Sequence, residues 1–301
     1  MSVVIVNPES AGGSTAETWP QIASDLRSQF GSFQPLFTKH HGDAATLAAE
    51  AARKGAKLII ACGGDGTVSE VANGILASGK DVELGILPSG TGGDFRRTLE
   101  IPSQSRAAAR VLQTGRTVRI DVGRVSYVDN DGAEAMRYFL GVASCGMSTK
   151  VVERVKSQKI SFASSLLQTA LRTEPIRLVV QLDDSHERHL TVSTLCIANA
   201  RYFGGGMKIA PDAKLTDGKF DVIGIGDLST LKLLTSATRV YLGSHLSMPE
   251  VSHTLARKVT VRPPDRASEI SLEVDGELPG RLPATFQIIP EALRVRVNDR
   301  N

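Results

Sequence analysis

A short glycine-rich motif, GGDGT at residues 63–67, has the residue types and spacing best suited to chemistry. It follows the apolar run LIIA, which predicts a strand buried on both faces. Adjacent glycines let a backbone approach a ligand closely, and the apolar spacing after residue 67 predicts a helix start, whose N–H groups suit phosphate. Asp65 adds a carboxylate beside which a hydrated metal ion could sit. An ordinary strand-to-helix turn would look similar, but the combination favours a phosphate-binding loop.

Two Asp-Gly pairs later in the chain supply further carboxylates. Asp275-Gly276 is followed by Glu277, so two carboxylates flank one glycine and leave one tight bend together. Asp-Gly is also the strongest short-range hairpin signal, and a hairpin could still carry a functional carboxylate. Asp217-Gly218 has the same ambiguity, because Asp217 either completes a cation site with oxygen ligands or forms a turn.

The elements around GGDGT alternate between strands and helices. We predict strands at residues 3–6, 34–38, 58–61 and 82–87, and helices at 18–30, 44–54 and 105–114, the second helix being capped by Asp43. This alternation predicts a doubly wound α/β domain with a parallel sheet. Small-residue loops at 7–13 and 88–95 also follow strands, and such sheets bind ligands beyond the carboxyl ends of their strands.

From residue 117 onward the pattern changes to β-branched runs that alternate with polar residues. Strands are predicted at 117–122, 138–143, 176–182, 190–198, 219–225, 258–262, 269–274 and 284–290, which indicates an antiparallel β-rich domain. Helical stretches at 149–172 and 228–242 interrupt them. We therefore expect domains at residues 1–121 and 122–290, and a last strand at 293–297 that could return residues 291–301 to the first domain.

Bulk composition restricts the classes of function. The chain has 301 residues, 41% of them hydrophobic, and a net charge of +3 with its Lys and Arg spread along the sequence. This argues against nucleic acid as a partner and is compatible with an anionic substrate or an anionic membrane surface. No apolar run approaches the ~20 residues that span a bilayer, so any membrane contact would be peripheral. Basic residues among apolar ones at 150–172 suit either an interfacial helix or a helix packed on the domain.

Cysteine usage and the N-terminus both indicate a cytoplasmic protein. Cys62, Cys145 and Cys196 lack metal-ligand or CxxC spacing, which indicates reduced thiols. The N-terminal run MSVVIVNPES lacks a basic region and turns after a few apolar residues, as a first strand does and a signal peptide does not.

Several motifs, taken in order, resemble the catalytic fold of diacylglycerol kinases, and most closely the soluble bacterial lipid kinases. They are Asn7-Pro8-x-Ser10, GGDGT, and P-x-G-T at 88–91 followed by Asp94-Phe95. The stretch GGGMKIAPDAKLTDG at 204–218 and VDGE at 274–277 strengthen the resemblance, because GGDGT alone is shared with NAD kinases. The likeness covers nearly the whole chain.

The resemblance implies a fold, two ligands and a set of site residues. Such kinases have a nucleotide-binding α/β domain and a β-rich second domain, with ATP in the cleft between them. It implies Glu277 as the general base with Asp275 beside it, and Asp65 as organiser of the reactive Mg²⁺. It further implies a structural Mg²⁺ held by the Asp217 side chain and the main-chain carbonyls of Lys214 and Lys219. The implied ATP contacts are Asn7, Pro8, Glu9, Ser10, Ala11, Thr38, Gly64, Asp65, Gly66, Thr67, Val68, Ser69, Glu70 and Thr91.

The implied activity is transfer of the ATP γ-phosphate to a lipid hydroxyl, most simply from ATP to diacylglycerol, giving phosphatidic acid at a membrane surface. Three residues depart from the family pattern: Ser69 and Gly93 replace asparagines, and Thr216 replaces an aspartate. Two alternatives therefore stay open, namely a kinase of NAD or another small molecule, and a nucleotide-binding regulatory module without catalysis. A homodimer is compatible with the resemblance, but no residue pattern specifies the oligomeric state.

Overall fold

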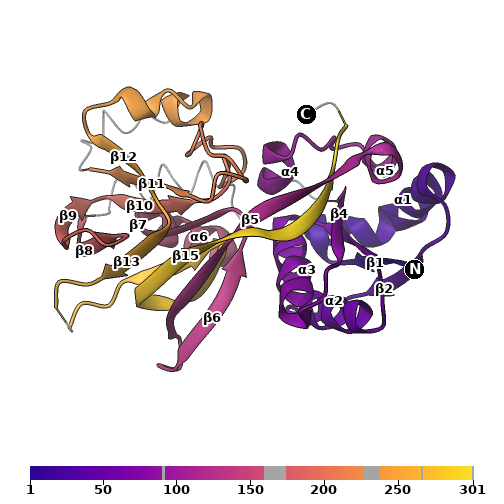
Figure 1. The fold of residues 1–301 in the computed structure, drawn as a ribbon, viewed down its shortest axis with the longest axis horizontal. Coiled ribbons are helices and arrows are strands. Elements are labelled where there is room, and N and C mark those ends of the chain that lie inside the picture. The colour runs from indigo at the N-terminus through magenta and orange to yellow at the C-terminus, as the bar shows by residue number, and fades with distance from the viewer. Residues whose placement is uncertain (90–91, 159–173, 227–237, 266, 300–301) are drawn as a thin grey trace. The chain divides into compact units, whose positions relative to one another are not determined.

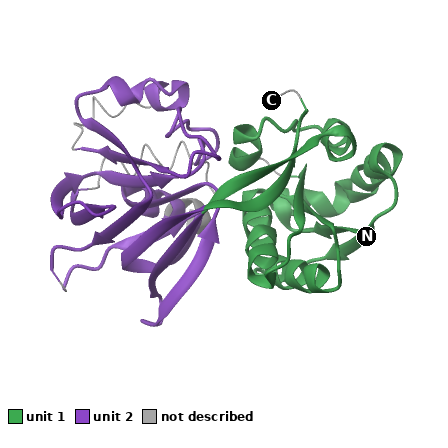
Figure 2. Ribbon diagram, in the orientation of Figure 1, with its two compact units in different colours: residues 1–122, 290–301 green, residues 123–289 purple. Residues whose placement is uncertain are grey.

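Two compact units make up the chain (Figure 2). The structure is a computed structural model that describes residues 1–89, 92–158, 174–226, 238–265 and 267–299, and only the backbone of residues 154–158. Unit 1 comprises Met1–Val122 and Pro290–Asn301, and unit 2 comprises Gly123–Ile289. Two strands, β5 (Arg116–Asp129) and β15 (Glu277–Val297), begin in one unit and end in the other. The C-terminal segment thus belongs to unit 1.

Unit 1 is built on a parallel sheet with the strand order β15, β4 (Glu83–Pro88), β3 (Leu58–Gly63), β1 (Ser2–Val6) and β2 (Gln34–Phe37). Every one of these neighbouring pairs is parallel. All six residues of β3 are buried, as expected for a central strand with helices over both faces. The doubly wound α/β arrangement predicted from the sequence is confirmed.

Helices cover this sheet in two pairs (Figure 1). One pair is α1 (Ser14–Phe30) with α5 (Ser105–Thr114), and the other is α2 (Asp43–Arg53) with α3 (Asp65–Ser78). The backbones of α2 and α3 approach so closely that a Cβ added to Gly74 would lie 2.1 Å from the carbonyl oxygen of Ala45. Shorter helical segments are η1 (Ser10–Gly13) and α4 (Asp94–Thr98).

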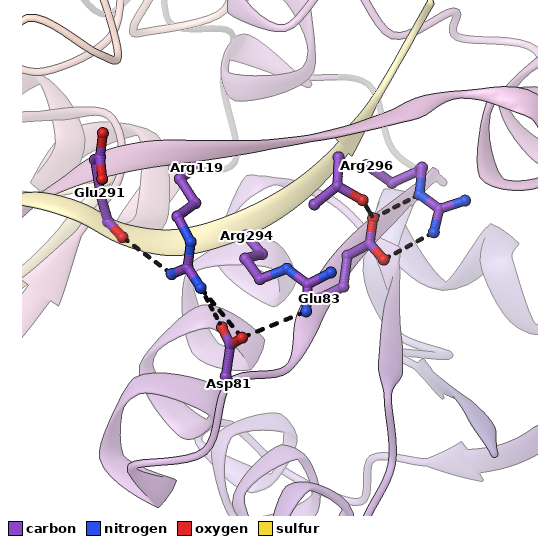
Figure 3. Close-up of polar contacts among 7 residues, drawn as sticks. Asp81, Glu83, Arg119, Glu291, Arg294 and Arg296 are labelled. Carbon is purple, nitrogen blue, oxygen red and sulfur yellow. Dashed lines mark hydrogen bonds and ion pairs between the residues drawn. The ribbon is translucent and has the colours of Figure 1, made fainter.

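An ion-pair network joins the end of β15 to β4 (Figure 3). Glu83, which is 5% exposed, accepts two hydrogen bonds from Arg296, at 2.5 Å from Nε and 2.8 Å from Nη2, and a third from the Thr117 hydroxyl at 2.6 Å. Burial acts to raise the pKa of Glu83, but the hydrogen bonds from Arg296 and Thr117 outweigh it, so the pKa lies below its usual value. Nearby, the exposed Asp81 pairs with Arg119 and Arg294. These contacts hold the returning C-terminal strand in unit 1.

Unit 2 consists of antiparallel strands in two groups. The first has the order β12 (Val251–Ala256), β11 (Phe220–Ile225), β10 (Thr194–Ala198), β7 (Val142–Gly146), β14 (Ser271–Val274) and β15. The second contains β9 (Arg188–Val192), β8 (Ile176–Leu182) and β13 (Lys258–Arg262), with β13 also paired to β15. β6 (Glu134–Phe139) pairs with β5, and α6 (Met147–Gln158) and η2 (His245–Ser247) complete the described elements. The predicted antiparallel β-rich domain is confirmed.

The core of unit 2 lies between these two groups of strands. Phe139 and Phe220 stack with ring centroids 5.6 Å apart, and Phe286 meets Phe139 edge-on at 6.3 Å. A second apolar cluster on the other face of β7, β10 and β11 includes Val142, Cys196 and Ile223. The chain at Ile209 and Ala213 covers that face.

Some sequence predictions of single elements were wrong. The predicted strand at 138–143 is two strands, β6 and β7, broken at Leu140 and Gly141, and the predicted strand at 190–198 is broken at Ser193 into β9 and β10. The runs at 284–290 and 293–297 form one strand, β15. β12 was not predicted, because most of its side chains are exposed and no alternation marks it. The helix predicted from residue 149 begins at Met147, and its part beyond residue 158, like most of 228–242, lies outside the described residues.

The contact between α2 and α3 yields a first prediction. Gly74→Ala should lower the free energy of unfolding of unit 1 by about 1–3 kcal/mol, because a methyl group has no room beside Ala45. Gly66→Ala on the same helix is the matched control, since no atom of the described part of the chain lies within 4 Å of its added Cβ and alanine favours a helix. Fluorescence of the single tryptophan, Trp19 on α1, reports urea unfolding of unit 1. Equal stability of the two variants would contradict the prediction.

The Glu83 network yields a second prediction. Glu83→Gln should destabilise unit 1 by about 3 kcal/mol at neutral pH, because it leaves the Arg296 guanidinium without its carboxylate. Asp81→Asn should change stability by less than about 1 kcal/mol, because that pair is exposed. The lowered pKa of Glu83 means that its contribution is lost on acidification, so the difference between wild type and Glu83→Gln should shrink as the pH falls. A difference that grows instead would refute this assignment.

Candidate active site

Three loops of unit 1 begin at the same edge of the parallel sheet. The strand register places Val6 beside Cys62, and Gly63 beside Pro88, so the loops after β1, β3 and β4 start level with one another. The Asn7 side-chain amide donates to the Thr67 hydroxyl at 3.0 Å, and the Ser89 main-chain N–H donates to the Gly63 carbonyl at 3.1 Å. Ligands of doubly wound sheets bind at this edge, so these loops are the candidate phosphate site.

A chain of hydroxyl groups ties the first loop to the third. Thr15 is fully buried, and its Oγ1 lies 2.6 Å from Ser10 Oγ and 2.6 Å from Ser89 Oγ. Ser10 also donates to the Asn7 carbonyl at 2.8 Å. Sequence reasoning missed Thr15 and Ser89, because nothing in a local pattern shows that residues so far apart in sequence share a hydrogen bond.

The glycines of GGDGT have different structural roles. A Cβ on Gly63 would lie 2.4 Å from Thr67 Oγ1, so Gly63 makes room for the threonine side chain. No atom of the described residues lies within 4 Å of a Cβ on Gly64 or Gly66, so the backbone there is not covered by them at the start of α3. Thr67, Val68 and Ser69 are buried, and the Val68 main-chain N–H already donates to the Gly64 carbonyl at 3.1 Å.

Asp65 orders the third loop. Its Oδ2 accepts main-chain hydrogen bonds from Gly93 at 2.7 Å and Asp94 at 2.9 Å, and its Oδ1 accepts one from Phe95 at 3.0 Å. The carboxylate therefore satisfies N–H groups at the N-terminus of α4. A carboxylate has about four acceptor positions, and the described residues occupy three of them, which leaves one on Oδ1. The magnesium role predicted for Asp65 stays a prediction.

Gly93 has a left-handed backbone, with φ of +83°. Glycine adopts this conformation without strain, and asparagine tolerates it better than most residues do. Glycine at this position therefore adopts without strain the backbone geometry that lets its N–H reach Asp65.

Glu70 caps a helix in this structure. Its carboxylate accepts main-chain hydrogen bonds from Gly42 at 3.0 Å and Ala44 at 3.2 Å, at the N-terminus of α2. The prediction that Asp43 caps this helix was wrong: Gly42 is the N-cap residue, and Asp43 instead accepts from the Lys39 main chain at 2.8 Å.

The remaining predicted nucleotide residues lie in or beside the loop edge. Pro8, Ser10, Ala11 and Thr38 are half-buried, Glu9 is exposed, and the Thr38 main-chain N–H donates to the Val6 carbonyl at 2.9 Å. Thr91 lies outside the described residues.

In unit 2, Asp275 and Glu277 lie on the hairpin that joins β14 to β15, which confirms the hairpin prediction. Asp275 and Gly276 both have positive φ, +49° and +82°, as a two-residue type I′ turn requires. The Asp275 carboxylate accepts from the main-chain N–H of Leu140 at 3.0 Å and of Gly141 at 2.9 Å. It thus holds the break between β6 and β7, and Glu277 follows half-buried.

Sequence reasoning missed a buried carboxylate beneath this turn. Glu273 on β14 is 3% exposed, and its carboxylate accepts hydrogen bonds from the Gly276 main chain at 2.6 Å and from the Ser144 hydroxyl. Burial raises the pKa of Glu273 to about 7 against the opposing effect of these two hydrogen bonds; the charge of Asp275 raises it and that of Arg137 lowers it. A glutamate in an apolar alternation was the signal that could have found it.

The predicted structural cation site has oxygen donors but few acids. Asp217 is exposed, and its Oδ1 accepts from the Lys219 main chain at 3.1 Å. Burial raises the pKa of nearby Asp221, and the charges of Asp217 and Asp212 raise it further. Within the described residues, no group of three or more His, Cys, Asp or Glu could hold a metal. The Mg²⁺ site predicted at Asp217 and the main-chain carbonyls of Lys214 and Lys219 stays a prediction.

The structure also bears on the cysteines and on membrane-spanning helices. Cys62, Cys145 and Cys196 are all free and buried, and burial raises the pKa of the Cys62 and Cys145 thiols to about 12. Among the helices that the structure describes, none combines the length and apolar character needed to cross a membrane.

Comparisons with known proteins agree with the motifs. The family model of the diacylglycerol kinase catalytic domain matches residues 1–125, and that of the YegS C-terminal NAD kinase beta sandwich-like domain matches residues 141–297. A diacylglycerol kinase of Mycobacterium tuberculosis (strain CDC 1551 / Oshkosh) is 32% identical over 259 residues, which cover 84% of this chain and 81% of the relative. One of Staphylococcus haemolyticus (strain JCSC1435) is 30% identical over 290 residues, covering 94% and 84%.

Solved structures share the fold. The crystal structure of a diacylglycerol kinase from Bacillus anthracis strain Sterne aligns with a TM-score of 0.75 at 23% identity, over 99% of this chain and 96% of that chain. At this identity the likeness speaks for the fold alone, and the sequence relatives and family models decide the membership. The resemblance noted in the sequence is thus confirmed, and the chain belongs to the diacylglycerol kinase family of lipid kinases.

Proposed function

We propose that this protein transfers the γ-phosphate of ATP to the hydroxyl of a lipid, with diacylglycerol as the simplest acceptor and phosphatidic acid as the product. Membership of the family supports a lipid kinase. The observation that carries the proposal is the set of three loops tied at one sheet edge by Asn7–Thr67, Thr15–Ser89 and Asp65–Gly93. Phosphoryl transfer depends chiefly on such prearranged donors around the phosphates.

The loops of unit 1 bind ATP in this proposal. Main-chain N–H groups at the start of α3, where no described residue covers Gly64 or Gly66, receive the phosphates. Asn7 holds Thr67 in place, and Asp65 holds the loop after β4 in the shape that receives the nucleotide. Magnesium, when bound, neutralises charge on the phosphates, and the remaining acceptor position of Asp65 is available to orient it or its water.

Glu277 acts as the general base. As the lipid hydroxyl oxygen attacks the γ-phosphorus, the bond from that phosphorus to the ADP oxygen breaks, and the hydroxyl proton passes to the Glu277 carboxylate. Asp275 supports the base by fixing the turn through Leu140 and Gly141. Asp217, with the main-chain carbonyls of Lys214 and Lys219, would hold a structural Mg²⁺.

The acceptor also determines where the reaction takes place. Diacylglycerol resides in membranes, so we place the protein in the cytoplasm and peripherally at an anionic membrane surface, which a net charge of +3 favours. The segment that could lie on that surface is residues 150–172. Its part beyond residue 158 lies outside the described residues.

Removal of the base tests the reaction. With labelled ATP, Mg²⁺ and a panel of lipid alcohols, wild type should label a lipid, and Glu277→Gln should lower kcat by roughly 100-fold or more. The affinity of Glu277→Gln for ATP should stay unchanged. In the control Glu269→Gln, whose side chain is 79% exposed in wild type, the affinity for ATP should also stay unchanged. Labelling of soluble NAD without any lipid would favour a small-molecule kinase. ATP binding without turnover in wild type would favour a regulatory module.

Removal of the Asp65 charge separates its two roles. Asp65→Asn replaces one acceptor oxygen with an N–H₂ donor, so at least one hydrogen bond to Gly93, Asp94 or Phe95 is lost. The melting temperature should fall by roughly 4 °C or more without nucleotide, and ATP affinity should fall about tenfold. The control Asp131→Asn changes an exposed aspartate. An unchanged melting temperature, with a defect seen only when Mg²⁺ is present, would make Asp65 purely a metal ligand.

A further inference from the structure

Glu273 is a carboxylic acid buried within the sheet of unit 2. Its strand neighbours Leu272 and Val274 point into the core of unit 2, so Glu273 faces the other side of β14. There it lies opposite Ser144 on β7, which in turn lies opposite Cys196 on β10. A buried carboxylate is costly unless hydrogen bonds compensate it.

The hydrogen bonds of Glu273 reach the turn that leads to Glu277. One carboxylate oxygen accepts from the Gly276 main-chain N–H at 2.6 Å, and the other accepts from the Ser144 hydroxyl. Gly276 is the residue immediately before Glu277 and the second residue of the two-residue turn. Asp275 holds the same turn from its other side through Leu140 and Gly141. The backbone that carries Glu277 is therefore clamped between two carboxylates.

Resting on the proposed function, we propose that Glu273 is a positioning residue that orients the base Glu277 by holding the Gly276 N–H. Ser144 sets the direction of the Glu273 carboxyl by donating to its second oxygen. Glu273 touches neither substrate nor phosphate in this account. It acts only through the turn.

The charged groups around Glu273 influence its ionisation, and the Gly276 amide can report it. Among the described residues, the titratable and charged groups that face Glu273 are Asp275 in the turn, Arg137 on β6 and Cys196 on β10. On the described part of α6, the charged side chains Lys150 and Glu153 are exposed. The Gly276 amide donates directly to the carboxyl group, so its proton resonance should report the titration of Glu273, with a midpoint near pH 7.

The activity test compares two substitutions at Glu273. Glu273→Leu has similar bulk and no acceptor, so the turn loses one clamp, and kcat should fall by roughly tenfold or more with the KM values for ATP and lipid within about twofold. Glu273→Gln keeps an acceptor oxygen for Gly276 and an amide for Ser144, so it should recover several-fold of that loss. Glu269→Leu, an exposed change beside the same strand, should leave kcat at the wild-type value. Equal kcat for wild type and Glu273→Leu, or equal loss in the Leu and Gln variants, would overturn the proposal.

The second readout does not depend on activity. In wild type the chemical shift of the Gly276 amide proton should change with a midpoint near pH 7, and this proton should exchange slowly with solvent. In Glu273→Gln the pH-dependent change near pH 7 should vanish while the slow exchange persists. In Glu273→Leu both should be lost, and if that variant does not fold, the wild-type and Gln spectra decide. A Gly276 amide that ignores both substitutions would refute the clamp. Absence of lipid kinase activity in wild type would refute the proposed function instead, and leave the amide result standing.

Discussion

Loop N–H groups need acceptors, and in this chain carboxylates supply them at the points on which the fold of the site depends. Asp65 accepts from three consecutive main-chain groups, Glu70 from two at the start of α2, and Asp275 from two between β6 and β7. Hydrogen bonds to an ionised acceptor are roughly twice as strong as neutral ones. The loops thereby gain a fixed shape without regular secondary structure.

This use of carboxylates explains why the sequence predicted the strands better than the breaks and loops between them. Apolar periodicity located β1, β3 and β4, and the Asp-Gly pair located the β14–β15 hairpin, because these signals act between near neighbours. The break at Leu140 and Gly141 depends on Asp275, more than a hundred residues away, and local patterning carries no trace of it. The same holds for Thr15 with Ser89 and for Asp65 with Gly93.

Several residues of the predicted site also have structural roles. Gly63 leaves room for Thr67, whereas Gly64 and Gly66 leave room for a ligand. Glu70 caps a helix, and Asp65 orders the loop that a nucleotide would meet. In the proposed reaction, unit 1 supplies ordered hydrogen-bond donors, and unit 2 supplies Glu277 on a turn held by Glu273 and Asp275. The acceptor specificity has no short motif, because apolar pockets select by shape.

In the proposed reaction the terminal phosphate of ATP passes directly to a lipid. The most direct measurement is mass spectrometry of lipids extracted after incubating the protein with diacylglycerol-containing anionic vesicles, Mg²⁺ and ATP labelled with heavy oxygen in its γ-phosphate. We expect one lipid to gain a phosphate with the heavy label, in a one-to-one ratio with the ADP formed. Heavy oxygen recovered only in inorganic phosphate, with every lipid unchanged, would contradict it.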